Sequence, residues 1–405
     1  MSRTIRLIAA SALASATVAA PAVAHARPTG PAAPVAKAPV TAGFTPVRTT
    51  SYAATSVAAT ARDGVVVVGT RSSTPGAAGA VVVEEQRNGR WTTQTLPGVT
   101  ATGAQVVSAT DKQQWILTIG ETPMLWRSQG NHYVKVAQPT MPAGITQWSP
   151  WAIAAEGGTV VLWGSSFSQA RGTQATSARL TGGRWTVTPF SSQPGGQSRQ
   201  GVPPLAGLAQ GRFVATVSFM GGHVWSTAYD LTATPPRVLG ATHVFHPTGE
   251  EWRTSDWVVR SAADITTWGS QRTWTDATFT RQSLRGLCKR LVNGATATCP
   301  APAWVVTAAT ALPDGRQVIG GEDTVPWRHQ DGSTGPVVQG GFAVVTGQST
   351  PVPVAGDPGD AVVDLVARST VTWAITRTGT TTTIQRAVRS EERRVGKECR
   401  SRWSP

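Results

Sequence analysis

Short apolar runs recur along the chain at nearly even spacing, and each run follows a pair of turn-forming residues. Val, Ile and Trp are common in them, as is typical of strands that are buried on both faces. No segment keeps a sustained helical period. The pattern therefore predicts an all-β protein. The runs occupy residues 65–69, 115–120, 160–164, 213–217, 265–269, 316–320 and 371–375.

The turns before these runs define the length of a repeat. From one turn to the next the steps are 48, 46, 53, 53, 51 and 54 residues. Repeats of about fifty residues that hold four short strands are typical of propeller blades. The turns are Asp63-Gly64, Asp111-Lys112, Gly157-Gly158, Gln210-Gly211, Ala263-Asp264, Asp314-Gly315 and Arg368-Ser369.

The content of each repeat indicates how its strands are arranged. The first strand is small and rich in alanine, as at Ala58-Ala59 and Ala154-Ala155, which suits the crowded axis of a propeller. A later hairpin at 89–92 returns at 183–186, two repeats further on. We therefore predict a seven-bladed β-propeller of four-stranded antiparallel blades over residues 43–388. A pair of β-sandwiches, the main alternative, does not predict one even period.

The last repeat supplies only three strands, at 361–366, 371–377 and 380–388, so the chain leaves its blade incomplete at the C-terminal side. Residues 43–47 contain Pro46, which is tolerated on the edge of a sheet. We expect this N-terminal segment to add the outer strand and to close the ring. The alternative is that a lost C-terminus carries that strand, or a further domain.

Residues 1–26 are predicted to form a secretory signal peptide. Arg3 and Arg6 precede an apolar run, and Ala24-His25-Ala26 provides a cleavage site of small residues. Residues 27–42 follow as a Pro/Ala-rich linker. The apolar run is too weak for a membrane anchor, and no later stretch is long enough to span a bilayer. We expect a secreted, soluble protein.

Residues 389–405 resemble a translated sequencing adapter, because one reading frame of a common adapter strand encodes them all. This tail holds the dense basic run that, as native sequence, would indicate a nucleic-acid patch. Without its net three positive charges, and without Arg3 and Arg6, the formal net charge falls from +14 to about +9. The remaining basic residues are scattered, which is typical of a solvated surface, so no nucleic-acid partner is expected.

The two cysteines outside the tail, Cys288 and Cys299, flank the hairpin signal Asn293-Gly294. With those two residues as the loop, Val292 faces Ala295, and counting outward brings the cysteines opposite each other. Opposed strand residues lie within the range of a disulfide, and export favours its formation. We predict a disulfide. No further ligands stand at metal spacing, so neither a metal nor a cofactor is expected.

Two local patterns carry a family resemblance. Val318 to Gly321 ends in Gly320-Gly321, and residues 126–133 and 327–334 each combine a Trp with polar residues and a Gly. The first pattern resembles the Kelch GlyGly element, and the other two resemble the Asp-box of sialidase-like propellers, one without its Asp and one without its final aromatic. The resemblance is to secreted bacterial β-propellers, and it implies a fold rather than an activity. We interpret the recurrent Trp and Tyr as blade packing.

Three segments, 240–256, 269–278 and 320–335, are predicted to be long loops on the face where propellers meet ligands. Acidic residues together with Arg and Trp from the neighbouring fifth and sixth blades would form a polar pocket with an aromatic floor, suited to a sugar or a peptide. The candidate binding residues are Glu250, Glu251, Trp252, Arg272, Trp274, Glu322, Asp323 and Trp327.

Two functions are consistent with such a face. One is non-enzymatic binding of an extracellular glycan, a cell-wall polymer or a secreted protein by a monomer. The alternative is a sialidase-like or other glycoside hydrolase that uses the acids of the face. Sialidase-like chemistry needs a tyrosine nucleophile, and Tyr52, Tyr133 and Tyr229 are not well placed for that role. No recognised hydrolase motif is present either, so we favour binding and assign no catalytic residue.

Overall fold

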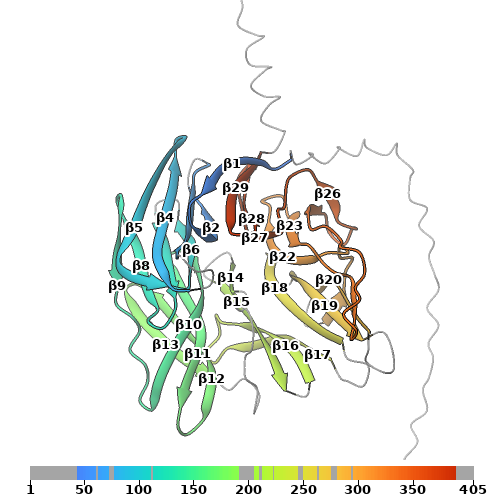
Figure 1. Ribbon diagram of the computed structural model, residues 1–405. Helices are drawn as coiled ribbons and strands as arrows, with labels where there is room; N and C mark the ends of the chain where they lie inside the picture. Colours follow the sequence, from blue (N-terminus) through green and yellow to red (C-terminus); the bar gives the residue numbers. More distant parts are fainter. Residues whose placement is uncertain are drawn as a thin grey trace, which may run out of the picture. The chain divides into compact units, whose positions relative to one another are not determined.

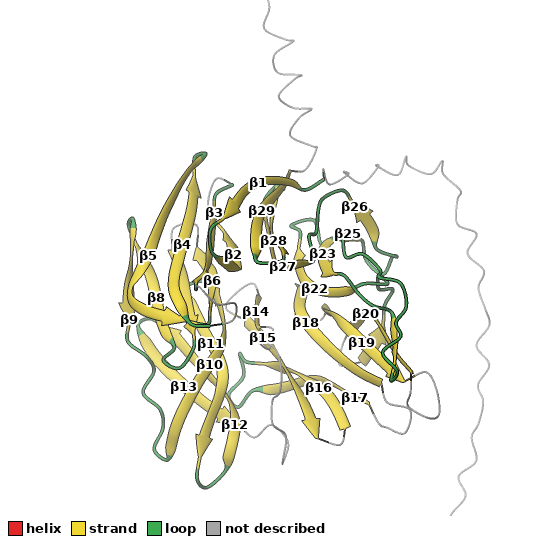
Figure 2. Cartoon of the chain, in the orientation of Figure 1, coloured by secondary structure: helices red, strands yellow, loops and turns green. Residues whose placement is uncertain are grey.

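The computed structural model of the chain describes residues 43–388 apart from 61–62, 73–76, 111–112, 191–204, 209–211, 222, 245–249, 262–263, 275–280 and 293–294. These residues belong to the second of the two units into which the chain divides, Pro39–Pro405. They form strands, turns and loops (Figure 2), and no helix among them could cross a membrane. The predicted signal peptide, linker and adapter-like tail lie outside the described residues.

The described strands form antiparallel groups of four that follow one another along the chain. The first group is β2 (Ala53–Ala59), β3 (Val65–Arg71), β4 (Gly79–Arg87) and β5 (Arg90–Ala101). The next is β6 (Gly103–Thr110), β7 (Gln113–Ile119), β8 (Met124–Gln129) and β9 (His132–Val136). Then come β10 (Ile145–Glu156), β11 (Thr159–Ser168), β12 (Gly172–Thr181) and β13 (Arg184–Phe190). They are followed by β14 (Leu205–Leu208), β15 (Arg212–Gly221), β16 (His223–Asp230) and β17 (Arg237–Val244).

The second half of the chain continues the pattern. One group is β18 (Glu250–Ser261), β19 (Asp264–Trp274), β20 (Arg281–Val292) and β21 (Ala295–Thr298), with β24 (Trp327–His329) added beside β20. The next is β22 (Val305–Ala311), β23 (Gln317–Glu322), β25 (Phe342–Val345) and β26 (Val352–Val354). The last is β27 (Ala361–Arg368), β28 (Val371–Thr378), β29 (Thr381–Val388) and β1 (Thr45–Thr50). A single paired position, Glu322 with Ala361, joins these two groups into one sheet.

The first strand of each group contacts the first strand of the next group. The contacts run through β2, β6, β10, β14, β18, β22 and β27, and β27 returns to contact β2 (Figure 1). A closed series of radially repeated four-stranded sheets is the arrangement of a β-propeller. The structure thereby confirms the predicted all-β propeller class. Each predicted apolar run also falls on a second strand, from β3 through β28, although the runs at 115–120 and 316–320 each extend one residue beyond β7 and β23.

Side chains of the first strands link neighbouring blades through one recurrent hydrogen bond. The Val106 backbone N–H donates to Ser56 Oγ at 3.3 Å, and the Ile153 N–H donates to Gln105 Oε1 at 3.2 Å. At the ring closure, the Val57 N–H donates to Asp364 Oδ2 at 2.8 Å. At these three junctions, a side chain of one first strand therefore supplies an acceptor to a backbone N–H of the next blade.

The N-terminal strand closes the last blade, as predicted. β1 pairs antiparallel with β29, from Thr45 opposite Arg386 to Thr50 opposite Thr382. The strand begins two residues later than the predicted segment 43–47 and extends further. With three strands from the C-terminal side and β1 from the other end, the blade that the chain's last repeat leaves incomplete has four strands.

The predicted disulfide is present between Cys288 and Cys299, whose Cα atoms are 5.1 Å apart. Val292 lies opposite Ala295, so the hairpin has the predicted register. Asn293-Gly294, from which that register was counted, lies outside the described residues.

Aromatic side chains fill the core between strands, which agrees with their interpretation as packing residues. Trp163, Trp268 and Trp373 are almost fully buried. Trp126 and Tyr133, from the Asp-box-like segment, pack in one apolar cluster between the first and second blades. Burial raises the pKa of the Tyr133 hydroxyl above its usual range, which does not suit a nucleophile.

Candidate binding site

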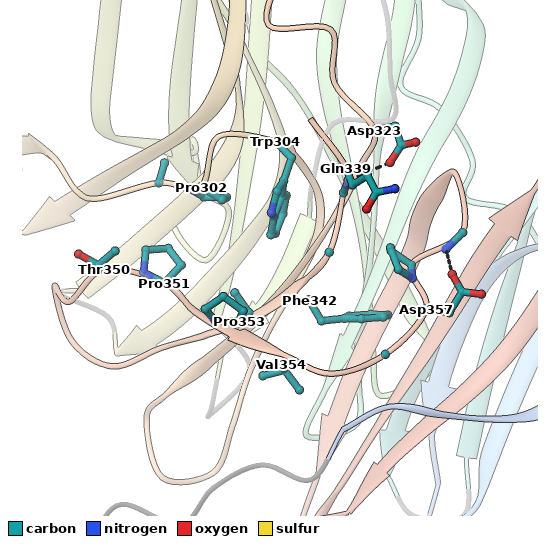
Figure 3. A pocket seen from close by; sticks show the side chains of 17 residues that line it. Pro302, Trp304, Asp323, Gln339, Phe342, Thr350, Pro351, Pro353, Val354 and Asp357 are labelled. Carbon is teal, nitrogen blue, oxygen red and sulfur yellow. Dashed lines mark hydrogen bonds between the residues drawn. The ribbon is translucent and has the colours of Figure 1, made fainter. Parts of the chain in front are cut away.

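A pocket of about 560 Å³ lies along the outer part of the β22–β26 blade (Figure 3). Its walls come from residues 301–304 before β22, from 339–343 at the start of β25, from 350–354 around β26, and from 356–359 before β27. The aromatic rings on these walls are Trp304 and Phe342, and we call the site the Trp304–Phe342 pocket. The volume is within the range of small-molecule sites.

Gly321, the second residue of the Gly320-Gly321 pair, positions the Trp304 ring. A Cβ atom on Gly321 would lie 2.0 Å from Trp304 Cε3 and 2.3 Å from the carbonyl oxygen of Val305. One edge of the indole therefore lies directly on the backbone of β23, where only glycine leaves room. The Gly321 N–H also donates to the carbonyl of Gly341 at 3.0 Å, which draws the start of β25 toward the same place.

Phe342 receives its support from the N-terminal segment. It is 2% exposed, and its ring stacks on Phe44 with centroids 4.0 Å apart and an interplanar angle of 20°. The Phe44 N–H donates to the carbonyl of Ala355 at 2.7 Å, which fixes the segment just before β1 against the loop after β26. The pocket is thus built by the sixth group of strands and backed by the segment that closes the ring.

Two carboxylates stand on the pocket rim, and each accepts a hydrogen bond from a backbone N–H of that rim. Asp323 Oδ1 accepts from Gly340 at 2.9 Å, and Asp357 Oδ1 accepts from Gly359 at 2.9 Å (Figure 3). The Asp323 N–H donates to the carbonyl of Asp360 at 3.1 Å, so the two rim segments are joined. These bonds hold the rim in shape and leave one oxygen of each carboxylate for other partners.

Prolines make up much of the remaining surface. Pro302, Pro351, Pro353 and Pro358 line the pocket together with the exposed side chains of Gln339 and Thr350. Proline rings have a fixed φ and lose little entropy when a ligand is bound. The result is a preformed apolar surface with a few polar groups at its edge.

The predicted candidate residues are distributed over two places. Glu250, Glu251 and Trp252 lie in β18, and Arg272 and Trp274 lie in β19, so the expectation that these residues belong to loops is wrong. The strands of this blade continue beyond the apolar core because their polar ends still pair, with Glu251 opposite Arg272. The side chains of these five residues lie outside what the structure describes.

The third predicted segment contributes one residue to the pocket. Asp323 lines it, whereas Glu322 ends β23 with its backbone paired to Val305 and Ala361. Trp327 lies in β24, 5.2 Å from the His329 ring in an edge-on contact, and it does not line the pocket. The structure therefore brings Asp323, which was predicted, together with Trp304, Phe342 and Asp357. These last three residues were not predicted from the sequence.

Catalytic carboxylic acids commonly have a raised pKa. Among the described carboxyl groups, burial raises the pKa of Glu156, and burial raises that of Asp364 to about 6 against the opposing effect of three hydrogen bonds. Glu156 ends β10 and Asp364 lies at the ring closure, so neither lines the pocket. No group of three or more metal-ligating side chains occurs among the described residues.

No protein-family model matches the sequence. No curated protein matches it either.

Several solved β-propeller structures are similar to the chain. An α-L-arabinanase of Penicillium chrysogenum in complex with arabinobiose has 10% identity and a TM-score of 0.46, over 87% of this chain and 99% of that one. The propeller domain of the Trilobed protease from Pyrococcus furiosus has 9% identity and a TM-score of 0.47, over 83% and 95%. A subtype N11 neuraminidase-like protein of A/flat-faced bat/Peru/033/2010 has 9% identity and a TM-score of 0.40, over 77% and 95%. At these identities the chemistry must be argued from this chain's own residues.

Proposed function

We propose that this protein is a secreted, non-enzymatic module that binds a carbohydrate in the Trp304–Phe342 pocket. The observation that carries the proposal is the construction of the pocket. Aromatic and proline rings form its walls, and its two carboxylates, Asp323 and Asp357, each hold a backbone N–H of the rim. Such a site can bind a ligand between its rings and orient it through its rim.

The mixture of flat apolar walls and polar edges suits a sugar. A pyranose presents one face of C–H groups that packs against an aromatic ring, while its hydroxyl groups point outward and need hydrogen-bond partners. Trp304 supplies a ring, and Gln339, Thr350 and the rim carboxylates supply donors and acceptors at the margin. The glycines at 340–341, 356 and 359 leave backbone groups within reach of a ligand.

Secretion is part of the proposal. The Cys288–Cys299 disulfide supports it, because such bonds persist in oxidising compartments. The basic and apolar start of the sequence, with its small-residue cleavage site, supports it further.

A glycoside hydrolase is the second candidate, and the register of β18 and β19 is the observation that favours it. Glu250 and Glu251 begin β18 opposite Thr273 and Arg272 near the end of β19, so two acidic residues and an arginine share one end of that blade. A retaining or inverting enzyme needs two carboxyl groups at a set separation. Glu250 and Glu251 are the residues whose replacement tests this candidate.

Retention on insoluble polysaccharides tests the binding function. The wild-type protein is expected to be retained on at least one member of a panel of cell-wall and storage polysaccharides, without release of soluble sugar. Trp304→Ala should weaken retention at least about fivefold, because a stacked aromatic platform contributes on the order of 1–3 kcal/mol. Trp327→Ala is the matched control, because Trp327 has the same side chain in the neighbouring β24 but does not line the pocket.

The same experiment separates the two candidates. Sugar release that is lost in Glu250→Gln or Glu251→Gln, and kept in Trp304→Ala, would overturn the binding proposal in favour of hydrolysis. Equal retention of the Trp304→Ala and wild-type proteins would also overturn it. Capture of proline-rich peptides in place of glycans would assign the same pocket to a protein ligand.

A further inference from the structure

The charge of the Trp304–Phe342 pocket is opposite to that of the chain. The full sequence carries a formal net charge of +14, and about +9 without the predicted signal peptide and the adapter-like tail. The described residues that line the pocket include two carboxylates, Asp323 and Asp357, and no Lys, Arg or His. The carbonyl oxygen of Asp360 accepts the Asp323 N–H, whereas the Asp360 side chain does not line the pocket and accepts from the Gly379 N–H at 2.6 Å. An acidic site on a basic protein favours cationic ligands locally, whereas the surface as a whole favours anionic ones.

The geometry leaves part of each rim carboxylate available. Gly340 and Gly359 each occupy one oxygen, Oδ1, of Asp323 and Asp357 respectively. No described residue donates a hydrogen bond to the second oxygen of either side chain, and both side chains are exposed. A carboxylate held by a backbone N–H of the rim has a fixed direction, so its second oxygen can accept a charge-assisted hydrogen bond from an ammonium group without first being ordered.

Arg377 contacts the same turn through its backbone. Its carbonyl oxygen accepts the N–H of Asp360 at 2.7 Å, while its side chain does not line the pocket. The negative charge of the rim is therefore not paired inside the site by a described cation. This arrangement disfavours an anionic ligand, which would lose its hydration beside like charges.

We infer that the pocket selects glycans that carry free amino groups and discriminates against glycans built from uronic acids. This inference rests on the proposed function and names the ligand class of the same site. An amino sugar would stack its ring on Trp304 and direct its ammonium group to the free oxygen of Asp323 or Asp357. A uronic acid would bring a carboxylate to the same rim.

The test compares three polymers at mildly acidic pH, where the amino groups of a glucosamine polymer are protonated. They are a glucosamine polymer (chitosan), its N-acetylated counterpart (chitin) and polygalacturonate. Non-specific attraction by a basic protein would favour polygalacturonate and repel chitosan, whereas the pocket should produce the reverse order. The variants are Asp323→Asn and Asp357→Asn, whose amide oxygens can still accept the rim N–H groups. Asp331→Asn is the matched control, because it removes the same charge from an exposed turn outside the pocket.

The wild-type protein is expected to bind chitosan most tightly and polygalacturonate least tightly. Each rim variant should weaken chitosan binding about three- to fivefold, the effect of one exposed ion pair, and should leave chitin binding unchanged. Added salt should reduce the difference between chitosan and chitin. Asp331→Asn should bind like the wild type.

Other results would overturn the inference in distinguishable ways. If polygalacturonate binds best, or if the rim variants bind chitosan as tightly as the wild type does, the inferred preference for amino groups is wrong. A loss of chitin or polygalacturonate binding in Trp304→Ala would then still support carbohydrate binding in the pocket. If none of the three polymers binds, but another polysaccharide of the wider panel is retained through Trp304, the amino-sugar inference alone fails. If no polysaccharide at all is retained, both the inference and the proposed function fail.

Discussion

Phe44 stacks on Phe342 with ring centroids 4.0 Å apart, and this contact joins the segment that closes the propeller to the wall of the candidate binding pocket. Phe44 immediately precedes β1, the strand that completes the last blade, whereas Phe342 begins β25 in the blade before it. Ring closure and pocket shape therefore depend on the same few residues. A substitution in the N-terminal segment should therefore change the ligand affinity of the pocket, although that segment does not line it.

Phe44→Ala should lower both stability and glycan binding. Phe44 is 4% exposed, and removal of a buried Phe ring commonly costs about 3–5 kcal/mol. Urea unfolding followed by tryptophan fluorescence measures the first effect, and polysaccharide retention measures the second. Phe44→Leu keeps most of the apolar volume, so its loss of unfolding free energy should be less than half of that in Phe44→Ala. An unchanged unfolding midpoint in Phe44→Ala would show that the stacking does not support the closure.

Gly321→Ala should displace Trp304, because the new Cβ would lie 2.0 Å from the indole. Overpacking of this kind costs about 1–3 kcal/mol, and the shifted ring should weaken glycan binding. Gly103→Ala is the matched control, since Gly103 also lies in a strand and a Cβ there would meet nothing within 4 Å. Equal unfolding midpoints for the two variants, with equal binding, would contradict the role given to Gly321.

The Arg48–Glu84 pair should contribute to ring closure. Arg48 in β1 donates to both carboxylate oxygens of Glu84 in β4, at 2.9 and 3.0 Å. The strand that completes the last blade is therefore also bonded to the first blade. Glu84 is 5% exposed, and charge-assisted bonds to a buried carboxylate are worth about 1–3 kcal/mol. A double-mutant cycle with Arg48→Met and Glu84→Gln measures the coupling free energy. A coupling near zero would mean that β1 is held by its backbone pairing with β29 alone.

Asp364 should make the stability of the ring depend on pH. Burial raises its pKa from an ordinary 3.8 to about 6, while hydrogen bonds from Val57, Ser56 and Leu365 lower it to a smaller extent. The folded protein then holds the proton more tightly than the unfolded chain does. The resulting stabilisation is fully present below about pH 4 and is lost as the pH rises through about 6, and it amounts to up to about 3 kcal/mol.

Asp364→Asn isolates that contribution. The amide oxygen can still accept the Val57 N–H, but it does not titrate. The free energy of unfolding of the variant, measured by urea titration between pH 4 and 8, should therefore lack the wild-type decrease through about pH 6. The variant should be the more stable protein above that pH. Parallel pH profiles for the two proteins would contradict the account of this carboxyl group.

Much of the fold could be predicted because blade strands are periodic and their turns carry strong local signals. The run at 65–69 became β3, and the Asn293-Gly294 signal gave the register that pairs Cys288 with Cys299. Even the outer strand β1 was predicted from Pro46 and from the missing fourth strand of the last repeat. Local patterning suffices here because each blade contacts mainly its neighbours.

The pocket could be predicted only in part, because it depends on contacts between segments that are distant in sequence. Asp323 was identified from a polar segment, but Phe342 matters through its stacking on Phe44 almost three hundred residues earlier. Trp304 could have been suspected from the glycine pair at 320–321, which implies a bulky neighbour on that strand. The prolines at 351, 353 and 358 were a further signal, since proline rings with a fixed φ make a rigid surface that loses little entropy on binding.

The central claim is that the Trp304–Phe342 pocket holds a carbohydrate, and a binding isotherm tests it most directly. The dissociation constant of the protein for a soluble oligosaccharide from the best-retained polymer should be measured by calorimetry for wild type, Trp304→Ala and Trp327→Ala. The account predicts an affinity at least about fivefold weaker in Trp304→Ala and an unchanged affinity in Trp327→Ala, with both variants folded. Equal affinities for wild type and Trp304→Ala would contradict it.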